Sequence, residues 1–127
     1  MKLFNSIAAT AMGGALLVLG ACGTSSTFTL GDYYKDLEAA GYVVSDKSEK
    51  LYQMVGAVDG AGFEVNGDSC EAYEFDLTTK SGQESLNKVK EEGFLGFVFP
   101  ETNRNLAVHC SGKGKGAKGA YQVLSNM

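Results

Sequence analysis

The clearest β pattern of the chain is Gly62-Phe63-Glu64-Val65-Asn66-Gly67-Asp68-Ser69-Cys70-Glu71-Ala72-Tyr73-Glu74-Phe75-Asp76. Phe63 and Val65 alternate with polar residues, and alternation returns at Tyr73 and Phe75. Between the two runs lies Asn66-Gly67, the dipeptide that a two-residue type I′ turn favours. We therefore predict a β-hairpin at the centre of the fold.

A helix is predicted directly after this hairpin, from Ser81 to Gly93. Ser81 and Glu84 have the spacing of a capping box, in which each side chain accepts a hydrogen bond from the other residue's backbone N–H. Leu86 and Val89 then fall on the face that turns toward the core. Gly93 suits the end of the helix.

The C-terminal part repeats the arrangement of a hairpin followed by a helix. Residues Leu95–Phe99 and Asn105–Cys110 are interpreted as two strands around a turn at 100–104. A last helix is predicted over Ala117–Asn126, with Ala117, Tyr121 and Leu124 on one face.

The N-terminal part of the domain is predicted to be helical, with one short extended piece. A helix over Asp32–Ala40 is expected to use Asp32 as its cap and to end at Gly41. Residues 42–44 are interpreted as a packed segment or a short strand. Helical turns are expected from Ser48 onward, because apolar residues follow at helical spacing: Leu51, Met54, Val55 and Val58.

These elements predict an α+β fold. The order α-(α)-β-β-α-β-β-α favours an antiparallel sheet of about four strands, built from two hairpins, with helices packed on one face. It also resembles small Gram-positive lipoproteins of unknown function, a resemblance that assigns no site.

Cys70 and Cys110 are predicted to form a disulfide, but strand geometry makes the prediction difficult. Cys110 shares a face with Leu106 and Val108, whereas Cys70 falls on the opposite face from Tyr73 and Phe75. If all the apolar residues face one core, a β-bulge at Glu71 or Ala72 is needed to bring the two sulfurs together.

The alternative for the same residues is a metal or thiol site formed by Cys70, Cys110 and His109, the only histidine. His109 and Cys110 are neighbours on a strand, so their side chains are expected to point to opposite faces. No C-x-x-C or H-E-x-x-H motif accompanies them. We therefore expect no catalytic residues and no cofactor.

Two further stretches suggest ligands. Ser111–Gly119 is rich in glycine and lysine but lacks the spacing of a phosphate-binding P-loop. We interpret it as a glycine-rich connection, or as a surface where Lys113, Lys115 and Lys118 contact anionic lipid headgroups. Six acidic residues lie around the first hairpin: Asp59, Glu64, Asp68, Glu71, Glu74 and Asp76. They are interpreted as a solvated edge of the sheet, with a calcium site as the alternative.

Charge argues against nucleic acid as a partner. The formal net charge is −4, with 11 basic and 15 acidic residues, and Lys2 is the only charged residue of positions 1–21. Residues 22–127 are therefore more acidic still. Nucleic-acid binding requires clustered lysine and arginine, so we exclude it as the main role.

The N-terminus indicates where the protein is located. Lys2 precedes a mostly apolar run that ends in Leu19-Gly20-Ala21-Cys22. These four residues resemble the lipobox of bacterial lipoproteins, which implies a cleaved signal peptide over 1–21 and a diacylglyceryl group on Cys22. A retained transmembrane helix is the alternative, but the uninterrupted apolar run is shorter than a span requires.

The resemblance implies an extracytoplasmic protein anchored to the bacterial cell membrane, or to the outer membrane in a Gram-negative cell. Residues 22–31 would be the lipidated cysteine and a short tether, and 32–127 a single domain. We expect a non-catalytic binding module for a protein or envelope ligand. The alternatives are a metal or thiol-redox lipoprotein using Cys70, His109 and Cys110, and a structural envelope component.

Overall fold

The predicted hairpin is present at the centre of the sheet. In the computed structural model, which describes residues 27–127, β2 (Asp59–Val65) and β3 (Asp68–Glu74) pair antiparallel without interruption. Asn66 and Gly67 form the turn with φ of 47° and 87°, the left-handed conformation that a type I′ turn needs at both positions.

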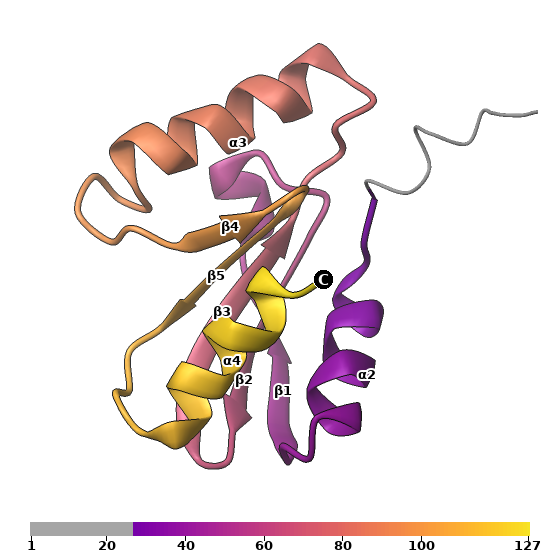
Figure 1. Cartoon of the computed structure of the whole chain (residues 1–127). Helices are drawn as coiled ribbons and strands as arrows, with labels where there is room; N and C mark the ends of the chain where they lie inside the picture. Colours follow the sequence, from indigo (N-terminus) through magenta and orange to yellow (C-terminus); the bar gives the residue numbers. More distant parts are fainter. Residues whose placement is uncertain (1–26) are drawn as a thin grey trace, which may run out of the picture.

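The sheet has five antiparallel strands in the order β1-β2-β3-β5-β4, one more than predicted (Figure 1). The additional edge strand is β1 (Val44–Glu49), where a short segment at 42–44 and a helix from Ser48 were predicted. Its sequence Val-Ser-Asp-Lys-Ser-Glu lacks apolar alternation, and a bulge at 45–48 with Asp46 at a φ of 52° breaks its register. In place of the helical turns predicted from Ser48 onward, the structure has a single 3₁₀ turn, η3 (Tyr52–Val55).

The second hairpin forms with a different first strand. β5 (Leu106–Cys110) was predicted, but its partner β4 is Glu101–Asn103, and the prediction of a strand at Leu95–Phe99 is wrong. Phe94 and Val98 instead exchange backbone hydrogen bonds of 2.6 and 3.1 Å, which closes residues 94–98 into a tight turn.

Three helices complete the fold: α2 (Leu30–Ala39), α3 (Lys80–Glu92) and α4 (Lys115–Ser125). The caps differ from the prediction. Thr29 caps α2, with Asp32 as its reciprocal partner at the third helical position, and the Thr79 hydroxyl accepts from the Gly82 N–H at 2.9 Å to cap α3. In both cases a threonine two or three residues upstream satisfies the free N–H groups better than the residue we predicted.

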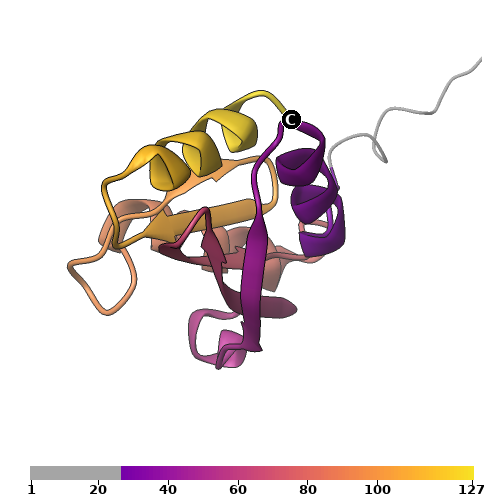
Figure 2. The same ribbon diagram turned by 90° about the horizontal axis from the view of Figure 1, so that it is seen from below.

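The sheet is covered on both faces, so the prediction that all helices pack on one face is wrong. α2 and α4 cover one face (Figure 2). Their side chains join Phe63, Val65 and Ala72 in a first core. α3 and η3 cover the other face, where Leu86 and Val89 pack against Tyr73 and Phe75 in a second core. Every element described lies in residues 30–127, and within this part of the chain no helix is long and apolar enough to cross a membrane.

Candidate functional site

The disulfide between Cys70 and Cys110 is formed. The two cysteines are directly opposite each other on β3 and β5, and both are buried in the first core. No bulge is required at Glu71 or Ala72, because Tyr73 and Phe75 belong to the second core on the other face of the sheet. The two-sided sheet thus removes the conflict in the sequence pattern.

His109 does not meet the two cysteines as a third ligand. It is paired with Glu71 across the sheet, on the face opposite to Cys110. Each cysteine sulfur is bonded to the other, which leaves neither as a thiolate ligand. Residues 27–127 hold no group of three or more His, Cys, Asp or Glu side chains placed to bind a metal ion.

The glycine- and lysine-rich stretch wraps the Asp68 carboxylate. One oxygen of Asp68 accepts from the Ala117 N–H at 2.9 Å, at the third position of α4, whose own cap residue Gly114 has no side chain. A Cβ atom at Gly112 or Gly114 would lie 2.9 or 2.7 Å from a carboxylate oxygen of Asp68. Glycine is therefore needed here for close approach, and an internal carboxylate caps the helix.

The other acidic residues of the first hairpin are dispersed. Glu74 accepts from the Leu30 N–H at 3.1 Å, Glu71 accepts from the Tyr73 hydroxyl at 2.7 Å, and Asp76 accepts from the Thr78 N–H. Burial, together with neighbouring carboxylates, raises the pKa of Glu74 despite the Leu30 hydrogen bond. Burial, the hydrogen bond to Glu71 and its charge raise the pKa of the Tyr73 hydroxyl. The cluster serves local structure at several separate points.

Phe28, within the predicted tether 22–31, is bound to the domain. The side chain of Asn105, 1% exposed, accepts from the Phe28 N–H at 2.8 Å and donates to the Phe28 carbonyl at 2.7 Å. Arg104 lies over the Phe28 ring, 5.2 Å from its centroid. The predicted lipidation site Cys22 and the signal peptide lie outside the described residues, and lipidation stays a prediction.

Lys113, Lys115 and Lys118 lie at the far end of β5 from Phe28. Phe28 is bound beside Leu106, whereas the lysines follow Cys110, about 13 Å further along the strand. The end of the domain where the tether enters is therefore not the end that carries the lysines. Their predicted contact with lipid headgroups remains a prediction.

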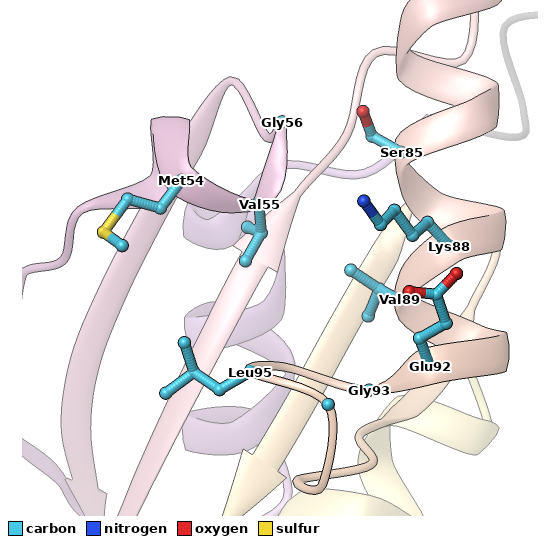
Figure 3. Close-up of a pocket in the computed structure, with 10 residues that line it drawn as sticks. Met54, Val55, Gly56, Ser85, Lys88, Val89, Glu92, Gly93 and Leu95 are labelled. Carbon is cyan, nitrogen blue, oxygen red and sulfur yellow. The ribbon is translucent and has the colours of Figure 1, made fainter.

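An apolar groove on the second face was not predicted from sequence. Its volume is about 380 Å³. Ser85, Lys88, Val89 and Glu92 of α3 form one wall, with Met54 and Val55 of η3 opposite and Leu95 of the 94–98 turn below (Figure 3). Met54 and Leu95 are 73% and 78% exposed.

Exposed apolar side chains continue beyond the groove. Among the described residues, seven large hydrophobic side chains are exposed, and all except Val43 lie on the two segments that form this part of the surface: Leu51, Met54, Val58, Leu95, Phe97 and Phe99. The sequence had predicted helical turns from Ser48 onward and a strand at Leu95–Phe99 for these two segments. The exposure of both segments identifies them as a candidate contact surface.

Comparison with known proteins gives no family for this chain. No protein-family model matches it, and no similar curated protein or solved structure was found.

Proposed function

We propose that this protein is a lipid-anchored, extracytoplasmic binding module that acts without catalysis and holds a protein partner at the apolar groove between α3, η3 and the 94–98 turn. The observation that carries this proposal is the gathering of six exposed large hydrophobic residues on two neighbouring segments. Isolated exposed hydrophobic residues are ordinary, whereas a groove formed by two segments that carry several of them is typical of protein contact sites.

The rest of the chain is compatible with this role. Leu19-Gly20-Ala21-Cys22 resembles a lipobox, and a disulfide is expected in an oxidising compartment outside the cytoplasm. Asn105 holds Phe28, six positions after Cys22, which supports a domain kept close to the membrane. Two covered sheet faces make a rigid support on which a small contact surface can be presented.

The backbone at Leu95 supports the same location. Its φ of 55° is unusual for a residue other than glycine or asparagine, and the side chain gains little burial in return. A strained, exposed leucine is the kind of feature that is retained for binding rather than for stability.

Photo-crosslinking in cells tests this proposal. Benzoylphenylalanine at position 97 is expected to give a discrete adduct in the membrane fraction, and Met54→Ser in the same chain is expected to reduce its yield. The matched control is benzoylphenylalanine at Val43, which is 65% exposed but lies away from the groove. The same adducts from both positions, or none from position 97, would contradict the proposal.

A further inference from the structure

A second pocket lies on the same loop but at a different part of the surface. It has a volume of about 400 Å³, and the residues that border it include Phe99, His109, Lys113, Lys118 and Tyr121. Phe99 follows the 94–98 turn that forms the groove, so one loop borders both sites.

Two lysines, Lys113 and Lys118, border this pocket, and no aspartate or glutamate does. His109 also borders it from β5, but its side chain points to the face opposite to Cys110, on the side of Glu71. The groove, by contrast, has both Lys88 and Glu92 at its wall. In a chain with a formal charge of −4, a pocket with only basic groups is an exception to the general composition.

The carboxylate of Asp68, which lies beside this loop, is engaged at the start of α4. It caps α4 through the Ala117 N–H and is enclosed by Gly112 and Gly114. The loop that wraps Asp68 places Lys113 at the pocket, and the first turns of α4 place Lys118 there. The hydrogen bond between Asp68 and the start of α4 therefore helps to place Lys113 and Lys118 at the pocket.

Part of the remaining wall, at Tyr121 and Cys110, is held by contacts within the fold. The Tyr121 hydroxyl accepts from the Cys110 N–H at 2.7 Å, and Cys110 is held by its disulfide to Cys70. His109 is half-buried on β5, and Phe99 supplies an aromatic surface. A preformed site loses less entropy when it binds its ligand.

We propose that this pocket binds a phosphate ester, with Lys113 and Lys118 at the phosphate oxygens and Phe99 beside the alcohol or sugar part. Lysine is a good point-charge partner for phosphate, and the two lysines supply positive charge to its oxygens. The volume is at the lower end of the range for small-ligand sites. This inference goes beyond the proposed function and depends neither on the groove nor on lipidation.

Calorimetric titration of the full chain in a non-ionic detergent tests it, with glycerol phosphate as the probe. Saturable binding is expected, weakening as salt is added. The double variant Lys113→Gln/Lys118→Gln is expected to bind about tenfold more weakly, as two exposed charge contacts are lost. Removing lysines near the N-terminus of α4 does not oppose the helix dipole, so the variant should fold.

The matched control is Lys115→Gln/Lys90→Gln, which removes the same charge from exposed positions that do not border the pocket. It should bind within twofold of the unaltered chain. Equal loss in both double variants, or no saturable binding to the unaltered chain, would overturn the proposal. Tighter binding of poly(glycerol phosphate) than of glycerol phosphate would identify a polymer as the source of the ester, and tighter binding of phosphatidylglycerol vesicles would identify a lipid headgroup.

Discussion

Replacing Leu95 by asparagine should stabilise the fold. Leu95 adopts a left-handed conformation with a φ of 55°. That conformation costs an L-residue with a bulky side chain roughly 1–2 kcal/mol, whereas asparagine adopts it readily. The leucine side chain is 78% exposed, so its loss removes only about 0.5 kcal/mol of hydrophobic burial. The expected net gain in the free energy of unfolding is about 1 kcal/mol.

Urea unfolding followed by circular dichroism measures this gain directly. The midpoint should rise while the slope of the transition stays constant. Phe97→Asn is the matched control, because Phe97 is 72% exposed in the same turn without a positive φ. If Leu95→Asn is no more stable than the unaltered chain, or if Phe97→Asn gains as much, the conformational argument at Leu95 is refuted.

Three further predictions follow from the disulfide, the α4 cap and Glu74. Replacing both Cys70 and Cys110 by alanine should lower the free energy of unfolding by about 4 kcal/mol, because the 40-residue loop is no longer closed in the unfolded chain, and denaturant titration would measure the loss. Asp68→Ala should cost about 1–2 kcal/mol and increase hydrogen exchange at the Ala117 N–H, and unchanged exchange there would contradict the cap. Burial raises the pKa of Glu74 in the folded state above its ordinary value of 4.5, so the folded chain holds this proton to higher pH and its stability falls as pH rises above about 4.5. Glu74→Gln keeps an acceptor for the Leu30 N–H, and its stability advantage should grow between pH 4 and pH 7, as thermal unfolding at several pH values would show.

The elements with strong local signals could be predicted from the sequence. Asn66-Gly67 determined the first hairpin, Gly93 the end of α3, and the odd–even pattern of β5 the side chains that face the first core. The place of each strand within the sheet could not be predicted equally well. β1 is an edge strand with polar side chains on a broken register, so neither face of it carries an apolar pattern.

The two-sided sheet explains why the disulfide looked difficult. Tyr73 and Cys70 are both buried, but on opposite faces of the sheet. The alternation of apolar residues in the sequence does not show whether a sheet is covered on one face or on both. The same limit applies to the candidate sites. The apolar run at 95–99 is typical of a core strand, and only the 94–98 turn places Leu95 and Phe97 in solvent. Asp68 and the glycines of 112–116 are more than 40 positions apart, so their contact depends on tertiary structure.

The proposed function can be tested most directly by the mass of the mature N-terminus. The protein would be isolated from membranes of the producing bacterium, digested, and its N-terminal peptide measured by mass spectrometry. A peptide that begins at Cys22 and carries a diacylglyceryl group is the predicted result. A mature chain that retains residues 1–21, or one that begins at an unmodified residue, would contradict the lipid-anchored binding module proposed here.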